Sequence, residues 1–160
     1  MKSWPQIAII GSRNCSSEII NIAEQTGRLI ASHNAVHICG GKEGVMEAAA
    51  RSAKAEGGLT VGILPGSSKE EANLYIDIKI PTDMGHARNA IIVRAADCLI
   101  AIAGGYGTLS EIALALQMEK PVVILPQSGK LRGPFLQTLQ KQQSRRRCAF
   151  AVKAKQMLCR

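Results

Sequence analysis

The feature of this sequence that most constrains its fold is a repeated unit, in which a short, mainly apolar run ends within two residues of a glycine and leads into an amphipathic stretch. Such runs occupy residues 6–11, 36–39 and 98–102, and apolar residues near helical spacing follow each of them. Runs that are apolar throughout are typical of strands buried on both faces of a sheet. The repeated unit therefore predicts an α/β protein with a Rossmann-like, doubly wound parallel sheet.

The remaining segments extend the same pattern within a single domain. We expect further strands at 60–64, 76–80 and 121–125, and helices at 18–32, 45–56, 85–96 and 109–118. Residues 76–80 alternate between isoleucine and polar side chains, which predicts a strand near a sheet edge with one face wetter than the other. We assign residues 1–143 to one Rossmann-like domain and residues 144–160 to a basic C-terminal tail, whose periodicity fits neither a helix nor a strand.

The basic residues are concentrated near the C-terminus. The net charge is +8, but residues 1–119 contain 10 Lys and Arg against 12 Asp and Glu, whereas residues 120–160 contain 10 basic residues and no acidic one. Charge of this uneven kind marks an appendage and says little about the body of the fold. Aromatic residues make up only 3% of the chain, which argues against a surface that stacks nucleic-acid bases. We therefore expect no nucleic-acid partner.

The cysteines and the N-terminus bear on the compartment. The five cysteines are an odd number and form no C-x-x-C pair, which favours a reducing compartment. The apolar run within residues 1–11 is too short for the h-region of a signal peptide or for a membrane span. We expect a cytoplasmic protein that does not enter a membrane.

Two glycine-rich loops follow strands and open helices. Gly40 and Gly41 follow one strand, and Gly104-Gly-Tyr-Gly-Thr108 follows another. In an open parallel sheet, ligands bind beyond the carboxyl ends of the strands. Glycine there lets the backbone approach an anion, and the unpaired N–H groups of a helix start favour phosphate. The two loops predict a phosphate site, although each can also serve as a plain turn.

The residues that several common types of binding site require are missing from this sequence. Neither loop fits G-x-x-x-x-G-K-[ST] or G-x-G-x-x-G, which argues against Walker-type NTPases and NAD-dependent enzymes. No lysine lies in a context that suggests a Schiff base with pyridoxal phosphate, and no cluster of His, Cys, Asp and Glu has the spacing of metal ligands. We expect neither NAD nor pyridoxal phosphate, and no metal site.

Three side chains near the loops have two interpretations each. Thr108 either offers its hydroxyl to the phosphate or caps the following helix, with Glu111 completing a capping box. Glu111 can instead face the crevice and act as an acid or base. Arg88 opens another predicted helix and is either an anion ligand or a solvated surface residue.

Four motifs, in this order, resemble a known superfamily. They are Gly40-Gly41 with Gly44-Val-Met-Glu47, residues 57–66 (GGLTVGILPG), Ala87-Arg-Asn89, and Gly104-Gly-Tyr-Gly-Thr-Leu-Ser-Glu111. Over about residues 6–125, the chain is similar to the superfamily that contains the LOG cytokinin-activating enzymes, the proteins long mislabelled as lysine decarboxylases, and the molybdenum cofactor carrier proteins.

Resemblance to the LOG enzymes implies hydrolysis of the N-glycosidic bond of a nucleoside 5′-monophosphate, with Arg88 and Glu111 as catalytic residues. The chain departs from the LOG motifs P-G-G-x-G-T-x-x-E and M-x-x-R-K in three ways. Ala103 replaces the proline, Asn89 replaces the lysine, and the spacing from Met84 to Arg88 is one residue longer. These departures favour a binding protein over an enzyme.

The chain looks closer to the molybdenum cofactor carrier branch, whose members bind the phosphate-bearing molybdopterin cofactor and form homo-oligomers. The resemblance implies that the chain binds molybdenum cofactor for protection, storage or transfer, with a LOG-type phosphoribohydrolase as the alternative. The helix at 109–118 is more apolar than one stripe facing a sheet requires, which also favours a dimer or tetramer. The residues that we expect to bind the cofactor are Gly11, Ser12, Gly40, Gly41, Arg88, Asn89, Gly104, Gly105, Tyr106, Gly107, Thr108 and Glu111.

Overall fold

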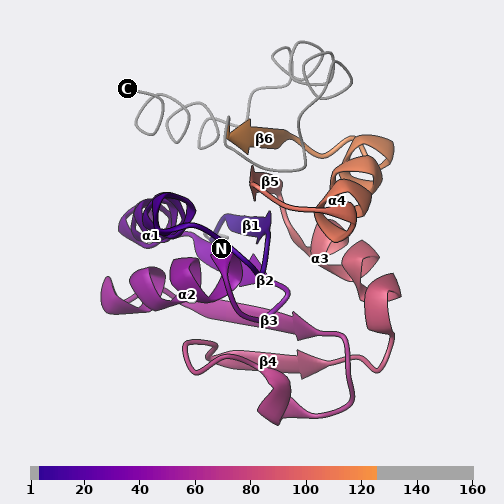
Figure 1. The fold of residues 1–160 in the computed structure, drawn as a ribbon, viewed down its shortest axis with the longest axis horizontal. Coiled ribbons are helices and arrows are strands. Elements are labelled where there is room, and N and C mark those ends of the chain that lie inside the picture. The colour runs from indigo at the N-terminus through magenta and orange to yellow at the C-terminus, as the bar shows by residue number, and fades with distance from the viewer. Residues whose placement is uncertain (1–3, 126–160) are drawn as a thin grey trace.

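The computed structural model describes residues 4–125, in which six strands form one parallel sheet (Figure 1). The strands are β1 (Gln6–Gly11), β2 (Val36–Cys39), β3 (Thr60–Leu64), β4 (Ile78–Pro81), β5 (Cys98–Ile102) and β6 (Val122–Leu125). The helices are α1 (Ser17–Ser32), α2 (Val45–Ala55), η1 (Lys69–Glu71), η2 (Gly85–Arg88), α3 (Asn89–Ala95) and α4 (Tyr106–Gln117). The predicted Rossmann-like α/β fold is confirmed, and the predicted basic tail at 144–160 lies outside the described residues.

The strand order is β4-β3-β2-β1-β5-β6, so the chain builds the sheet outwards from β1 in one direction and then returns to β1 to build the other side. β1 pairs with β2 through Ile7 opposite His37, and with β5 through Ile9 opposite Ile100. The order therefore reverses between β1 and β5. Ligands of doubly wound sheets bind at such a reversal, beyond the carboxyl ends of the strands.

Two helices cover each face of the sheet (Figure 1). Ile9 of β1 packs in one core with residues of α1 and α2, whereas Ile10, on the opposite face of the same strand, packs with residues of α3 and α4. This alternation of sides explains why both faces of β1 are apolar in sequence. All five residues of β5 are buried for the same reason.

α1 and α2 approach each other closely at Gly27. A Cβ atom at this position would lie 2.2 Å from the carbonyl oxygen of Ala49 and 2.3 Å from Oγ of Ser52. The missing side chain of Gly27 is therefore what lets the backbones of the two helices come together.

β4 is the edge strand beside β3, as its alternating sequence predicted. Its isoleucines are nevertheless the more exposed residues: Ile78 and Ile80 are 45% and 42% exposed, while Lys79 is partly buried. Ile80 pairs with Ile63, whose side chain belongs to the core under α3 and α4. The apolar face of β4 thus continues that core beyond the part of the sheet that the described helices cover.

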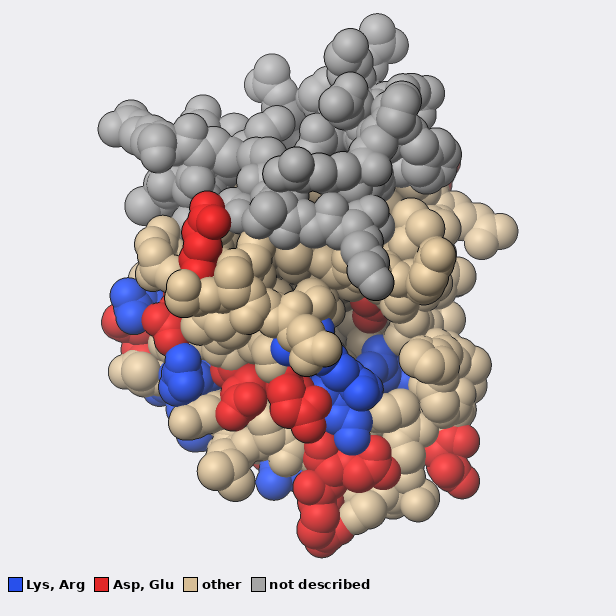
Figure 2. Space-filling model, viewed as in Figure 1, with Lys and Arg blue, Asp and Glu red and all other residues tan. Residues whose placement is uncertain are grey.

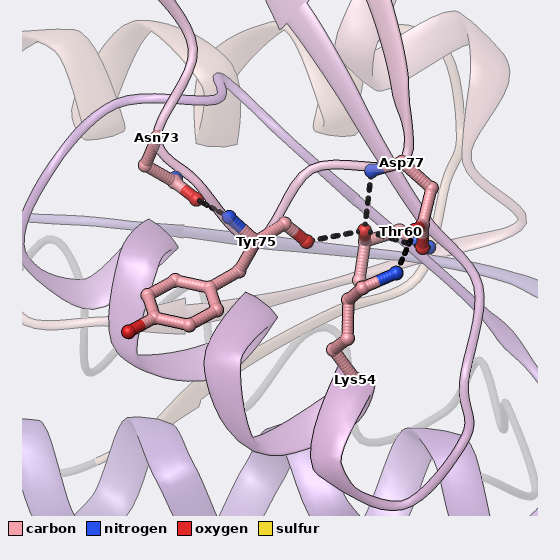
Figure 3. Close-up of polar contacts among 5 residues, drawn as sticks. All are labelled: Lys54, Thr60, Asn73, Tyr75 and Asp77. Carbon is pink, nitrogen blue, oxygen red and sulfur yellow. Dashed lines mark hydrogen bonds and ion pairs between the residues drawn. The ribbon is translucent and has the colours of Figure 1, made fainter.

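A polar network fixes the segment that leads into β4 (Figure 3). The buried hydroxyl of Thr60 donates to the carbonyl oxygen of Tyr75 at 2.6 Å and accepts the N–H of Asp77 at 2.9 Å. The carboxylate of Asp77 pairs with Lys54 at the end of α2 and accepts the N–H of Thr60 at 3.1 Å. Burial raises the pKa of Asp77, but these hydrogen bonds outweigh it, so its pKa lies below the ordinary value.

Candidate ligand site at the strand-order reversal

A cavity of about 310 Å³ lies at the carboxyl end of β1, where the strand order reverses. It is formed by the ends of β1 and β2, by η2 and the start of α3, and by the start of α4. Its lining residues are Ile9, Ile10, Gly11, Ser12, Arg13, Gly40, Met46, His86, Arg88, Asn89, Gly105, Gly107, Thr108 and Glu111. Three of the predicted binding residues, Gly41, Gly104 and Tyr106, are not among them.

The start of α4 supplies free backbone donors to this cavity. Gly105 is the N-cap residue, and no side chain among the described residues caps the helix. The first backbone hydrogen bond of the helix runs from Leu109 N to Gly105 O, so the N–H groups before it have no partner within the helix. A Cβ atom on Gly105 or Gly107 would meet no protein atom within 4 Å. Since both residues line the cavity, the space beside these donors is left for a ligand.

Gly104 has a different role from its neighbours. Its φ is +132°, and a Cβ atom there would lie 2.4 Å from Oγ1 of Thr108. Gly104 is therefore required for the turn itself. Because α4 begins at Tyr106, Thr108 lies in its first turn instead of capping it, and the buried Glu111 faces Arg88; the capping-box interpretation of these two residues was wrong.

Arg88 and Glu111 form a buried ion pair in the wall of the cavity. Nη1 of Arg88 lies 3.7 Å from Oε1 of Glu111, and the two side chains are 10% and 9% exposed. Arg88 passes over Gly40, where a Cβ atom would lie 2.6 Å from Nη2 of Arg88. Nε of Arg88 is buried without a hydrogen-bond partner among residues 4–125. The guanidinium is thus held at the cavity with donor capacity to spare.

Asn89 connects Arg88 to the first turn of α4. Its Oδ1 accepts a hydrogen bond from Nη1 of Arg88 at 2.5 Å, and its Nδ2 donates to Oγ of Ser110 at 2.8 Å. Oγ of Ser110 in turn donates to the carbonyl oxygen of Gly107 at 2.7 Å. A lysine at position 89 has no acceptor for the guanidinium, so this arrangement depends on asparagine.

Burial controls the charges of the site. Burial raises the pKa of Glu111 to about 7, and the neighbouring Arg88 only partly opposes this. Burial also lowers the pKa of Arg88, partly offset by Glu111, although a guanidinium remains charged at neutral pH. Cys39, beneath the pair, is a neutral thiol because burial raises its pKa to about 12.

The second glycine loop, at residues 40–44, is held by protein contacts. The first N–H of α2, from Val45, donates to the carbonyl oxygen of Ser12 at 3.0 Å. Nζ of Lys42 forms an ion pair with Oε2 of Glu71 at 2.8 Å. The carbonyl oxygen of Gly41 accepts the N–H of Asn73 at 2.8 Å. Of the two loops, the one at 104–108 is therefore the one that leaves donors free.

The structure adds Arg13, Met46 and His86 to the site, none of which was predicted to bind the ligand. Arg13 directly follows the predicted binding residues Gly11 and Ser12, and His86 comes two residues before Arg88, so their nearness in sequence was the available signal. Figure 2 shows basic side chains gathered near the centre of the molecular face, beside a hollow. Arg13 and Arg88 line the cavity together with one buried carboxyl group, that of Glu111, so the cavity suits an anion.

Comparisons with known proteins assign the chain to a family. A family model described as the SLOG cluster4 family matches residues 4–157. The chain belongs to this family. Among solved structures similar to this SLOG cluster4 chain is the molybdenum cofactor binding protein of Rippkaea orientalis, with 38% identity and a TM-score of 0.80 over 91% of this chain and 87% of the other.

Two further relatives of this SLOG cluster4 chain are named for different functions. The molybdenum cofactor carrier protein of Chlamydomonas reinhardtii is 32% identical, with a TM-score of 0.80, over 98% of this chain and 99% of the other. A cytokinin riboside 5′-monophosphate phosphoribohydrolase of Mycobacterium tuberculosis is 30% identical over 81% of this chain and 74% of its own length. The superfamily resemblance read from the four motifs is confirmed.

No group of three or more His, Cys, Asp and Glu within residues 4–125 is arranged to hold a metal ion. No helix in the same range is both long enough and apolar enough to cross a membrane.

Proposed function

We propose that the cavity binds the phosphate group of the molybdenum cofactor and that the protein carries this cofactor in the cytoplasm. The observation that supports this most strongly is the open space at Gly105 and Gly107, beside the uncapped start of α4. A phosphate there accepts hydrogen bonds from the N–H groups of the first turn and faces the helix dipole. Arg88, whose Nε has no hydrogen-bond partner among residues 4–125, lines the same cavity. The two structural neighbours named for this cofactor support the choice of heterocycle.

The second candidate is a phosphoribohydrolase, which the Arg88–Glu111 pair favours, together with the relative from Mycobacterium tuberculosis. The backbone conformation of the loop before α4 argues against a phosphoribohydrolase. Ala103, which replaces the proline of the LOG motif, has a φ of +51°, whereas the proline ring fixes φ near −65°. The loop before α4 therefore has a conformation that the LOG motif cannot adopt with its proline.

Incubating the protein with the ligand of each candidate function distinguishes the two functions. We expect incubation with AMP or an N6-modified AMP to release no free base, as measured by liquid chromatography. We expect molybdopterin added under anaerobic conditions to co-elute with the protein and to oxidise more slowly than free molybdopterin. Release of free base at a rate that falls at least ~10²-fold in Glu111→Gln would replace the carrier by the hydrolase.

A further inference from the structure

A binding protein has no catalytic use for the buried Glu111, which raises the question of what this carboxyl group does in the cavity. Its Oε1 lies 3.7 Å from Nη1 of Arg88, too far for a hydrogen bond and close enough for an ion pair. The carboxyl group is therefore only loosely held by its partner. It lines the same cavity as the free donors of α4, so a bound anion and Glu111 share one basic neighbour.

An ionised Glu111 opposes a bound anion in two ways. It repels the anion across the cavity, and because the Glu111 side chain is itself buried, this repulsion is stronger than between two charges in open water. It also competes for Arg88, the buried cation of the site. A neutral Glu111 removes both effects and adds one O–H donor to the wall. The protonated form of Glu111 is thus the form compatible with an anionic ligand.

We propose that Glu111 takes up a proton when a phosphate-bearing ligand binds, which frees Arg88 for the phosphate and makes the affinity fall as the pH rises. This role rests on the proposed function, because it requires an anion in the cavity. Burial has already raised the pKa of Glu111 to about 7 in the free protein, so the protonation is within reach at neutral pH. An anion placed nearby raises that pKa further.

The other charged or titratable groups around Glu111 leave it as the proton acceptor. Arg88 from η2 and Arg13 from the loop after β1 remain charged. Cys39 from β2 remains a thiol, because burial raises its pKa to about 12. His86 from η2 is exposed and also lines the cavity, so an effect at His86 must be distinguished from an effect at Glu111. His86 therefore needs its own control.

The test uses inorganic sulfate as the probe, because sulfate stays a dianion throughout the pH range examined whereas a phosphate group gains a proton near pH 6. Calorimetric titration of the full-length protein in two buffers with different ionisation enthalpies gives the number of protons taken up. We expect more than about half a proton per bound sulfate at pH 7.5. We also expect the affinity to fall about tenfold from pH 6 to pH 8. The calorimetric result needs no variant, so it stands even if a substituted protein folds poorly.

Two variants assign the proton. Glu111→Gln should bind sulfate with less than about a twofold change over the same pH range, whereas His86→Asn should keep the pH dependence of the wild type. Absence of proton uptake in the wild type, a full pH dependence in Glu111→Gln, or its loss in His86→Asn would overturn the role of Glu111.

A third variant, Gly105→Val, distinguishes failure of the proton-uptake proposal from failure of the proposed anion site. Sulfate that binds the wild type but not Gly105→Val supports the anion site whatever the pH dependence shows. Sulfate that fails to bind the wild type, or that binds Gly105→Val equally well, would refute the anion site itself and the proton uptake with it.

Discussion

At the scale of single residues, burial shifts the pKa values of two side chains in opposite directions. Burial lowers the pKa of His37 to about 4 and raises the pKa of Glu111 to about 7. Between about pH 4.5 and pH 6.5, the unfolded chain holds a proton on His37 that the folded protein lacks, and the folded protein holds a proton on Glu111 that the unfolded chain lacks. The two groups therefore affect the free energy of unfolding with opposite signs.

When one of the two groups is substituted, we expect the free energy of unfolding to vary with pH as the titration of the other group dictates. Relative to the wild type, Glu111→Gln should lose stability more steeply as the pH falls from about 6.5 towards 4, because His37 is then unopposed. His37→Leu should lose stability more steeply as the pH rises from about 4.5 to 7, because Glu111 is unopposed. Each difference should approach about 1.4 kcal/mol per pH unit.

Urea unfolding at a series of pH values measures both slopes. Slopes that coincide in the wild type and both variants would show that neither group titrates with a shifted pKa in the folded protein.

Single residues also show what the sequence could and could not predict about the site. Arg88 and Gly105 were predicted from motifs. An anion site needs the charge of Arg88 and the close approach to the backbone that Gly105 allows. Arg13 carries no motif, since an exposed arginine in a loop is common and only the folded chain brings it to the cavity. The pairing of Arg88 with Glu111 likewise joins two elements that are distant in sequence.

At the scale of the elements, two glycines within helices should respond oppositely to the same substitution. Gly107 lies in the first turn of α4 with open space beside it, so Gly107→Ala should raise the free energy of unfolding by roughly 0.5–1 kcal/mol, the usual gain in a helix. Gly27 lies against the backbone of α2, so Gly27→Ala should lower it by roughly 1–3 kcal/mol through overpacking. Gly107→Ala should also weaken anion binding.

Chemical denaturation of the two variants beside the wild type checks this pair. Equal and stabilising effects of both substitutions would mean that α1 and α2 are not in close contact at Gly27.

The elements with continuous apolar runs were predicted at nearly their true bounds, as β5 shows. The starts of the helices were harder. α4 begins three residues before the predicted Leu109, because its N-cap is a glycine without a capping side chain and thus carries no start signal. The predicted helix at 85–96 is the short η2 followed by α3; Gly85, at its start, has a φ of +53°. Local sequence does not encode such changes of helix type.

At the scale of the whole molecule, the apolar surface favours self-association. On α4, Leu109, Leu114 and Leu116 are only partly buried, and on the sheet edge Ile78 and Ile80 are exposed. Apolar surface that a single copy leaves open is typically covered by a partner. We expect a homo-oligomer, at least a dimer, in sedimentation velocity at micromolar concentration. A single species of 17.1 kDa would contradict this expectation.

For the whole molecule, we propose above all that the start of α4 holds the phosphate of a molybdenum cofactor. Native mass spectrometry of protein purified anaerobically from cells that make this cofactor tests this proposal most directly. Gly105→Val is the matched variant, because a Cβ atom at position 105 extends into the ligand space and meets no protein atom within 4 Å. We predict that the wild type retains a mass equal to the cofactor and that Gly105→Val, folded equally well by circular dichroism, retains none. A wild type without ligand, or equal cofactor content in both proteins, would contradict the claim.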